Sequence, residues 1–362
     1  MSLLTLFVSG ANMRRLLTLV VVALTASTSF AESVKGTPAI KSITAMAFGP
    51  DGVLFVGDPA SSTIFAIATG DTKPTGKDDV KVEKITEQIG SMIGVPAAQV
   101  TINDMKVNPA SGNVYLAVTR GKAMDAAVLI VRLTRDGKLA EFPMKDVVFS
   151  SVVLSNATDK QRMEAITSLG FASGKLIVAG LSNEEFASTL RSIDYPFVEA
   201  NKGAGVKIFH GAHGKFETQA PVRTFTTYKV DGKEQILAAY TCTPLVTIPV
   251  EDLKAGAKVT GTTIAELGNR NRPLDIIVYK KDGKDFVLMA NNARGIMKIS
   301  ADQFSKAESI TARPKGDTAG VKFETVAEWK GVLQLDKLDE GRALILVKAD
   351  NGDMNVKSIA MP

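Results

Sequence analysis

Residues 43–57 read ITAMAFGPDGVLFVG. Two short apolar segments, Ile43–Phe48 and Val53–Gly57, flank a turn composed of Gly, Pro and Asp. Such a turn between two apolar runs is typical of a β-hairpin, because Gly and Asp tolerate the backbone conformations of tight turns. The stretch therefore predicts two antiparallel strands joined at residues 49–52.

The same unit recurs along the chain. Five more first strands are predicted, each followed by a polar turn and a second apolar segment, at residues 102–107, 166–171, 222–228, 274–279 and 332–338. A third apolar segment follows most units, at residues 63–68, 127–133, 205–209, 245–250 and 295–299. Successive units begin 52–64 residues apart. Four-stranded units at roughly this period are typical of propeller blades. We therefore predict an all-β, six-bladed β-propeller of four-stranded blades. A β-sandwich or two small β-domains is the alternative.

The outer strand of a blade is predicted at three places, Lys138–Pro143, Phe216–Pro221 and Val259–Leu267. After residue 332 the chain has room for only three strands. We predict that Glu32–Ile40 supplies the missing outer strand, so that the N-terminal segment closes the ring in the last blade and removes an exposed sheet edge. Residues 81–93 carry the one helical pattern, which we interpret as a structural insertion.

The N-terminal residues have the pattern of an export signal. Arg14 and Arg15 precede an apolar run, Leu16–Leu24, and small residues stand at Ser29 and Ala31, where a signal peptidase reads the chain. The run is shorter than the roughly 20 residues that cross a membrane. We predict a signal peptide over residues 1–31 and a single propeller domain over residues 32–362, secreted or periplasmic, with no membrane span after cleavage. A retained N-terminal anchor is the alternative.

Composition excludes several classes of protein. The formal charge of +5 comes from lysines scattered along the chain, without the basic block and interleaved aromatic residues that bind nucleic acid, so no nucleic-acid partner is expected. Cys242 is the single cysteine, so no intramolecular disulfide forms and the hydrophobic core must hold the fold.

Propellers usually bind ligands at the end of the ring where the central channel opens. The loop that enters the first strand of a blade and the loop between its second and third strands both lie at this end. Loops are polar by default, which alone explains much of their composition. The ligand-binding residues predicted from these loops are Asn103, Asp104, Glu164, Asn183, Glu184, Arg191, Tyr195, Tyr240, Cys242, Arg272, Asp275, Asn291, Asn292 and Arg294.

Two of these regions stand out. In the third unit, Ser182–Ala204 is predicted to be an insertion that includes Arg191 and Tyr195, and its length favours a lid or a partner-contact loop over a flap that covers an edge. In the fifth unit, two arginines and two amide side chains are predicted to grip a carboxylate, sulfate or phosphate. The alternative is a structural bridge between Arg294 and Asp275. Both regions are expected to border one concave site, with Tyr240 as an aromatic wall.

Both histidines of the chain lie in His210-Gly211-Ala212-His213. Aligned with the other units, this stretch is predicted to be a turn between third and fourth strands, at the end opposite the channel mouth. We therefore predict a structural turn and no metal site, with an adventitious copper or zinc site as the weaker alternative. Cys242 then has no histidine near it, so a buried thiol is favoured over a catalytic nucleophile.

The repeated strand, Asp-Gly turn and strand resemble the six-bladed propellers of the gluconolactonase, strictosidine-synthase-like and NHL-repeat group. In the calcium-dependent lactonases of that group, a glutamate in the first blade binds the metal, and Ile43–Pro50 contains no glutamate. An oxygen-rich calcium set by another route is the possibility left open, with Asn183, Asn291, Asp275 and Glu164 as its members.

We therefore predict an exported propeller that binds a small polar or anionic ligand, or a partner protein, at the channel mouth, with no cofactor and no chemistry of its own. A calcium-assisted hydrolase or lactonase is the first alternative. The second is a periplasmic metal-binding protein that uses His210, His213 and exposed methionines.

Overall fold

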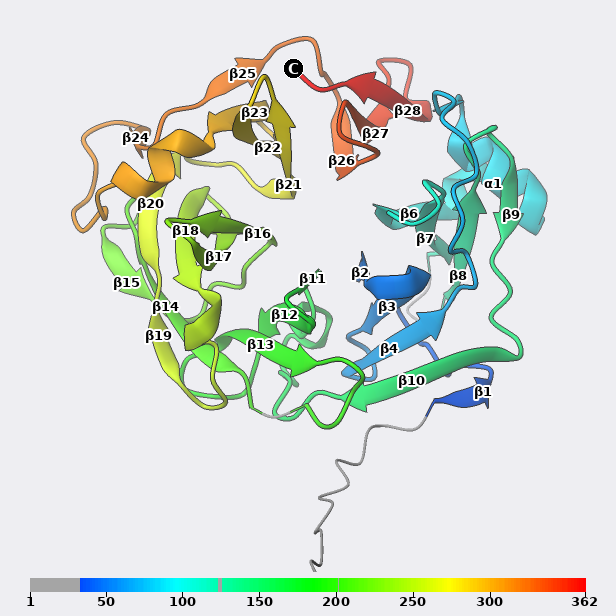
Figure 1. The fold of residues 1–362 in the computed structure, drawn as a ribbon, viewed down its shortest axis with the longest axis horizontal. Helices are drawn as coiled ribbons and strands as arrows, with labels where there is room; N and C mark the ends of the chain where they lie inside the picture. Colours follow the sequence, from blue (N-terminus) through cyan, green and yellow to red (C-terminus); the bar gives the residue numbers. More distant parts are fainter. Residues whose placement is uncertain (1–32, 123–125, 201) are drawn as a thin grey trace, which may run out of the picture.

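The computed structural model describes residues 33–122, 126–200 and 202–362. Antiparallel sheets stand around a central channel as six blades, and the first strand of each blade faces the channel (Figure 1). The predicted six-bladed β-propeller is confirmed. The predicted signal peptide lies outside the described residues, and none of the helices in the described ranges is long and apolar enough to cross a membrane.

The first two strands of every blade agree with the sequence prediction. The inner strands of blades 1 to 6, numbered along the chain, are β2 (Ala45–Phe48), β6 (Val100–Val107), β11 (Ser168–Ala172), β16 (Thr224–Val230), β21 (Pro273–Lys281) and β26 (Val332–Lys337). Their hairpin partners are β3 (Val53–Asp58), β7 (Val114–Arg120), β12 (Lys175–Leu181), β17 (Lys233–Ala239), β22 (Lys284–Asn291) and β27 (Arg342–Lys348). In the first turn, Asp51 and Gly52 have φ of 54° and 69°, the left-handed region that this hairpin needs.

Third and outer strands complete the blades. The third strands are β4 (Thr63–Ala68), β8 (Ala127–Leu133), β13 (Ser188–Asp194), β18 (Pro244–Pro249), β23 (Gly295–Ser300) and β28 (Met354–Ala360). The outer strands, in the same blade order, are β10 (Val147–Val153), β9 (Leu139–Glu141), β14 (Ala204–His210), β20 (Thr262–Leu267), β25 (Glu324–Val326) and β5 (Lys81–Val82). Blade 4 carries one more strand, β24 (Thr318–Gly320), on β20.

Blades do not follow one another around the ring in sequence order. The inner strand β2 lies between β6 and β11, and β6 in turn packs beside β26. Blade 1 therefore stands between blades 2 and 3, and blade 2 stands next to blade 6 (Figure 1). The chain first forms three strands of blade 1 and then runs past blade 2 to add β5 to blade 6. It returns to form blade 2, adds β10 to blade 1, and then forms blades 3 to 5 and the remaining strands of blade 6.

Two blades are consequently assembled from distant segments. In blade 1, β10 reaches back from blade 2 to pair with β4, and in blade 6, β5 pairs with β28. The prediction that Glu32–Ile40 closes the last blade is wrong, because β1 (Val34–Gly36) pairs with β10 in blade 1 instead. The outer edge of blade 6 is already occupied by β5, which the sequence pattern had merged with the following helix α1 (Ile85–Ile93).

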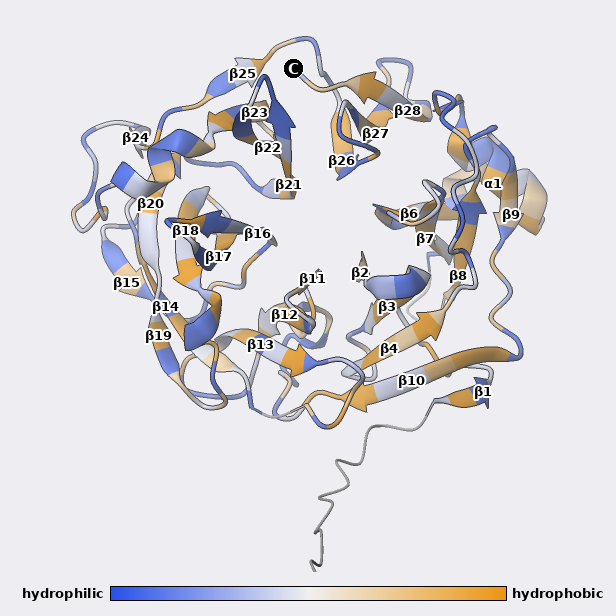
Figure 2. Cartoon of the chain, in the orientation of Figure 1, coloured by the Kyte–Doolittle hydropathy of each residue, from blue (hydrophilic) through white to orange (hydrophobic). Residues whose placement is uncertain are grey.

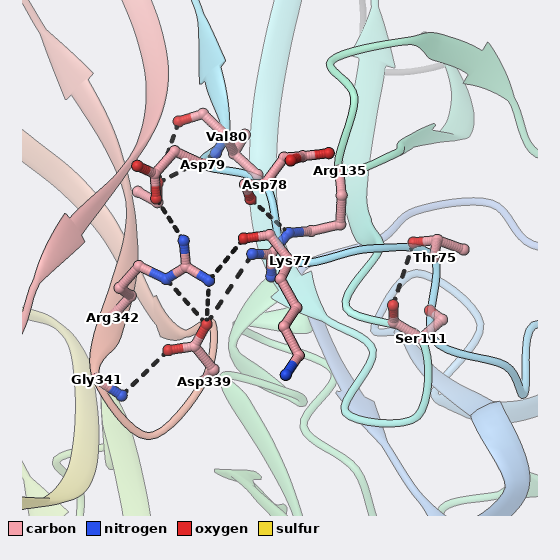
Figure 3. A network of polar contacts seen from close by, with 11 residues as sticks. Thr75, Lys77, Asp78, Asp79, Val80, Ser111, Arg135, Asp339, Gly341 and Arg342 are labelled. Carbon is pink, nitrogen blue, oxygen red and sulfur yellow. Dashed lines mark hydrogen bonds and ion pairs between the residues drawn. The ribbon is translucent and has the colours of Figure 1, made fainter.

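A polar network fixes the segment that leads from β4 to β5 between blades 6 and 2 (Figure 3). Arg342 of blade 6 donates to the Asp79 carboxylate and, at 3.0 Å, to the Lys77 carbonyl. Arg135 of blade 2 donates to the Asp78 carbonyl at 2.9 Å. Two arginines from neighbouring blades thus hold the backbone that delivers the closing strand.

Blade 3 differs most from its prediction. Ser188–Asp194 is not part of a lid but the third strand, β13, paired with β12 along its whole length. The predicted third strand, Gly205–Phe209, is the outer strand β14, and the predicted outer strand begins in β15 (Lys215–Glu217), beyond β14. A parallel strand, β19 (Lys258–Thr260), also pairs with β14. The apolar pattern missed β13 because Arg191, 1% exposed, occupies one of its buried positions.

Apolar residues are concentrated on the strands of all six blades (Figure 2). They pack between neighbouring sheets, so the core is divided into clusters at blade interfaces rather than gathered at one centre. Between blades 3 and 4, for example, Ile177 and Val206 pack with Ile236 and Val246, all buried. The inner strands line the channel with both polar and apolar residues.

Candidate functional site

A pocket of about 230 Å³ opens at the end of the channel where the inner strands begin. All six blades contribute to its lining, and most of the contributed side chains are polar. One polar residue from each of blades 1 to 6 illustrates this: Thr44, Asn103, Thr167, Arg223, Arg272 and Gln334. A single recess shared by six blades is where a propeller brings the largest number of independent chain segments to one ligand.

The floor of this pocket is an ionic cluster. The Lys106 ammonium lies 3.2 Å from a carboxylate oxygen of Asp104 and 3.3 Å from one of Asp275. A second pocket, of about 560 Å³, lies beyond them along the channel, and both Lys106 and Asp275 line the two pockets. The cluster therefore stands between the channel mouth and the rest of the channel.

Three aspartates of this cluster also join the blades to one another. Each lies on the inner strand of one blade and accepts a hydrogen bond from the inner strand of the next. The donors are backbone N–H groups, of Met46 to Asp104 at 2.6 Å, of Leu335 to Asp275 at 3.0 Å and of Val107 to Asp336 at 2.7 Å. Hydrogen bonds of this kind to a charged group are worth about 1.5–3 kcal/mol each, so the cluster stabilises the ring as well as lining the channel.

Burial raises the pKa of the buried aspartates in this cluster and opposes the charge of the lysine, whereas the attraction between the lysine and the carboxylates acts in the opposite direction. Burial raises the pKa of Asp275 to about 7, against the attraction of Lys106, and the nearby Asp104 charge adds to the rise. Burial also raises the pKa of Asp336. Burial opposes the charge of Lys106, but its carboxylate neighbours outweigh burial and raise the pKa of the ammonium. A strongly perturbed carboxyl group in a pocket is a marker of functional sites.

Two arginines stand at the rim of the pocket, with different partners. Arg223 donates to the Glu164 carboxylate at 2.6 Å and is neutralised by it. Arg272 is exposed, and within the described residues its guanidinium makes no hydrogen bond or ion pair, although its backbone N–H bonds the Asn292 side chain at 2.8 Å. Arg272 is thus the cation that remains available to a ligand.

The structure places five of the predicted site residues in or beside this pocket: Asn103, Asp104, Glu164, Arg272 and Asp275. It adds Lys106 and Arg223, which the sequence analysis missed. Lys106 follows Asp104 by two residues, and residues two apart in a strand point to the same face. The predicted strand therefore already indicated that Lys106 lies beside Asp104. Arg223 was missed because the predicted inner strand began at residue 222, whereas β16 begins at Thr224 and leaves Arg223 in the entry loop.

The fifth-blade cluster does not form one site. Asn291 is buried and accepts a hydrogen bond from Asn271 at 3.0 Å. Arg294 pairs with Asp317 at 3.2 Å in a separate recess, so neither the predicted anion grip that includes it nor the alternative bridge to Asp275 is correct. The reason is the long excursion after β23, which brings Asp317 of the β24 region next to Arg294.

The predicted residues of blade 3 are likewise dispersed. Asn183 and Glu184 bond to Asp159 and Asn156 in neighbouring loops and do not line the pocket. Arg191 is buried in β13, where it donates to the Ser155 carbonyl at 2.8 Å. Because β13 runs antiparallel to β12, Tyr195 comes next to the β11–β12 turn, at the far end of the ring. The predicted lid bordering the channel mouth is therefore wrong.

Two further expectations about blade 4 and calcium fail. Tyr240 is fully buried in the core between blades 3 and 4 and forms no aromatic wall. The predicted calcium set of Asn183, Asn291, Asp275 and Glu164 is not brought together, since each has a different partner. Among the channel carboxylates, the Lys106 ammonium occupies the place that a cation would take, so these residues do not fit calcium.

The histidines lie at the channel-mouth end, contrary to the prediction. His210 ends β14, which is an outer strand and therefore terminates at the same end as the loops between second and third strands. One ring nitrogen of His210, one of His213 and the sulfur of Cys242 all lie within 4.8 Å of one another. The error has the same cause as the missed β13, because one uncounted strand reverses the direction of everything that follows it in the blade.

Comparison with known proteins adds fold-level likeness only. No family model and no curated protein matches the chain. A structure described as a putative oxidoreductase (glucose dehydrogenase) of Thermus thermophilus is 11% identical, with a TM-score of 0.40, over 91% of this chain and 99% of that one. Streptogramin B lyase is 11% identical, with a TM-score of 0.36, over 91% of this chain and 98% of that one. Likenesses this weak indicate no function, which must be argued from the site.

Proposed function

We propose that this protein is exported and binds a small, hydrophilic, anionic ligand in the pocket at the channel mouth. The observation that carries the proposal is the Arg272 guanidinium, exposed at the rim of a polar recess that six blades share. An arginine offers a planar fork of donors that matches a carboxylate. Thr44, Asn103 and Thr167 also line the recess, and their side-chain oxygens, whose own hydroxyl or amide groups donate within the protein, remain able to accept hydrogen bonds from the polar remainder of such a ligand.

The size and floor of the pocket narrow the ligand class. A volume of about 230 Å³ is below the roughly 300–1,000 Å³ of drug-sized sites, which favours a small molecule. The carboxylates of Asp104 and Asp275 at the floor accept hydrogen bonds from ligand hydroxyl groups. A hydroxylated carboxylic acid, with its carboxylate toward Arg272 and its hydroxyl groups toward the floor, satisfies both ends.

Calorimetric titration with gluconate, and with glucose as the uncharged comparison, tests the proposal. We expect gluconate to bind and glucose to bind at least about tenfold more weakly, since a charge-assisted hydrogen bond contributes about 1.5–3 kcal/mol. Arg272→Gln should abolish this preference. Arg270→Gln is the matched control, because Arg270 is equally exposed two residues away but lines the separate recess of Arg294. Equal binding by both variants would contradict the proposal, as would no binding of gluconate.

N-terminal sequencing of the protein recovered outside the cytoplasm tests export. A mature chain that begins at Glu32 supports it, and a chain that retains residues 1–31 contradicts it.

A further inference from the structure

A second cluster of reactive side chains lies away from the channel, where the outer part of blade 3 meets blade 4. It consists of His210, His213 and Glu217 from the β14–β15 hairpin and Cys242 from the β17–β18 turn. The chain contains two histidines and one cysteine, and all three lie here. Their convergence joins segments about 30 residues apart in sequence that belong to different blades.

Glu217 fixes the orientation and the tautomer of both imidazoles. Its two carboxylate oxygens lie 2.8 Å from Nδ1 of His210 and 2.7 Å from Nδ1 of His213. A carboxylate only accepts, so each Nδ1 carries the proton and each Nε2 presents a lone pair. Metal-bound histidines commonly have this arrangement, with a carboxylate on the nitrogen that does not bind the metal.

One of these lone pairs has no partner. His210 is 2% exposed, and its Nε2 atom is buried without a hydrogen bond to any described residue. A buried polar atom left unpaired costs about 1–3 kcal/mol, so such atoms are rare in folded proteins. The His210 and His213 rings also lie against each other, with 3.9 Å between their centroids and 34° between their planes.

Both loops that carry the cluster are held by hydrogen bonds between blades. The Gly211 N–H donates to the Glu266 carboxylate of blade 4 at 2.6 Å, and the Thr263 hydroxyl donates to the Phe209 carbonyl at 2.6 Å. The Cys242 N–H donates to the Asn271 carbonyl of blade 5 at 2.7 Å. The positions of the two imidazoles and the thiol are therefore set by the ring and not by a free loop.

From this geometry we infer a zinc site with His210 Nε2, His213 Nε2 and Cys242 Sγ as its protein ligands. A zinc ion with bonds of about 2.0–2.3 Å holds its ligands roughly 3.3–3.8 Å apart. One ring nitrogen of each histidine and the Cys242 sulfur already lie within 4.8 Å of one another, so a small inward movement of these side chains completes the site. Imidazole and thiolate are ligands that zinc prefers, and binding releases the proton of the Cys242 thiol to solvent.

Access to the site is from solvent. The His213 side chain is 44% exposed, whereas that of His210 is 3% exposed, so the ion enters on the His213 side. Three protein ligands leave the fourth tetrahedral position to water or to an incoming molecule. The site also joins blade 3 to blade 4, so the bound ion cross-links the ring.

Titration of untagged, metal-free full-length protein with Co²⁺, followed by Zn²⁺, tests the assignment. We expect one equivalent of Co²⁺ to bind with a thiolate-to-cobalt charge-transfer band in the near ultraviolet, and one equivalent of Zn²⁺ to abolish the band. Because Cys242 is the single thiol, the band in itself identifies the ligand. Cys242→Ser should lose the band completely and should bind Zn²⁺ at least tenfold more weakly.

Glu217→Gln separates positioning from ligation. It keeps the three ligands but weakens the acceptor that orients both rings, so zinc affinity should fall about 10- to 100-fold while the cobalt band keeps its position. Glu251→Gln is the matched control, since Glu251 pairs only loosely, at 3.6 Å, with Lys233 at the surface, and it should bind like the wild type. Absence of a stoichiometric cobalt complex, a complex without the thiolate band, or unchanged zinc affinity in Cys242→Ser would each overturn the inference.

Discussion

Two clusters of ionisable side chains lie at the same end of the ring, and both are arranged around the position of a cation. In the channel, the carboxylates of Asp104 and Asp275 face the Lys106 ammonium at 3.2 and 3.3 Å. At the interface of blades 3 and 4, His210 and His213 face Cys242 within 4.8 Å. The first cluster already contains a cation, Lys106. The second consists of potential metal ligands, with no cation among them.

The difference shows how to distinguish a cluster that holds its own cation from one that can take an external ion. In the channel, each aspartate accepts a hydrogen bond from a backbone N–H of the neighbouring blade, and the Lys106 ammonium pairs with carboxylates, so the position of the cation is already filled. At the blade interface, Glu217 satisfies one nitrogen of each ring, and the remaining nitrogen of His210 is buried and unpaired among the described residues. An unpaired imidazole nitrogen beside a second imidazole and a thiol, and not the number of charges, indicates where an external ion belongs.

The largest expected effect comes from removing the internal cation. Lys106→Met leaves buried carboxylates without their counter-charge, and breaking a buried ionic cluster in this way costs about 3–5 kcal/mol. Denaturant unfolding should show this loss in the free energy of unfolding. Lys280→Met is the control, since Lys280 pairs with Asp285 at 3.5 Å on the surface and should cost less than about 1 kcal/mol. Similar losses of stability in the two variants would show that Lys106 contributes no more to folding than a surface lysine does.

Supplying the missing cation should give the next largest effect. At free zinc about 100 times its dissociation constant, the wild-type free energy of unfolding should rise by about 2.7 kcal/mol, because zinc binds the folded chain. A chelator should reverse the rise, and Cys242→Ser, which binds zinc at least tenfold more weakly, should rise by no more than about 1.4 kcal/mol. The channel cluster predicts no such response, so a full rise in Cys242→Ser would place the ion elsewhere.

The two clusters also depend differently on pH. Burial raises the pKa of Asp275 to about 7, above the roughly 3.9 of an unfolded aspartate. The folded protein therefore binds more protons than the unfolded chain between these values, so this carboxyl favours folding most at low pH. Its contribution is lost as pH rises from about 4 through 7.

Asp275→Asn removes that contribution. Between about pH 4 and 7, the slope of the free energy of unfolding against pH should be more positive in the variant than in the wild type, by up to about 1.4 kcal/mol per pH unit. Denaturant unfolding across this range measures the slope, and Asp285→Asn, in the β21–β22 hairpin beside Lys280, is the control. A variant with the wild-type slope would show that Asp275 does not titrate in this window.

Much of the ring was predictable because its signals are local. Asp-Gly turns between short apolar runs, as at Asp51 and Asp282, specify hairpins through the left-handed φ of their residues. Their spacing gave the number of blades. Assembly of blades 1 and 6 from distant segments was not predictable, because the two-residue strand β5 has no pattern of its own and its partner β28 lies more than 270 residues away.

Whether a site residue was predicted at the correct end of the ring depended on whether the strands of its blade were counted correctly. Asp104, Arg272 and Asp275 were found because the inner strands were correctly assigned, and loop position alone then brought them to the channel mouth. His210 and His213 were placed at the wrong end because the buried Arg191 hid β13 and shifted the strand count by one. Glu217 lies four residues after His213, and only the hairpin shows that it reaches both rings.

The smallest expected effect is that of Cys242→Ser in metal-free protein. Cys242 and Thr243 both have positive φ, at 62° and 53°, in a turn held by backbone hydrogen bonds that do not involve the sulfur. Serine has nearly the same size and accepts the same conformation, so the free energy of unfolding should change by less than about 0.5 kcal/mol. Denaturant unfolding with and without zinc measures both states of one pair of proteins. If the thiol serves only to pack the blade interface, the variant loses the same stability in both conditions; if it is a metal ligand, the loss is confined to the zinc-loaded protein.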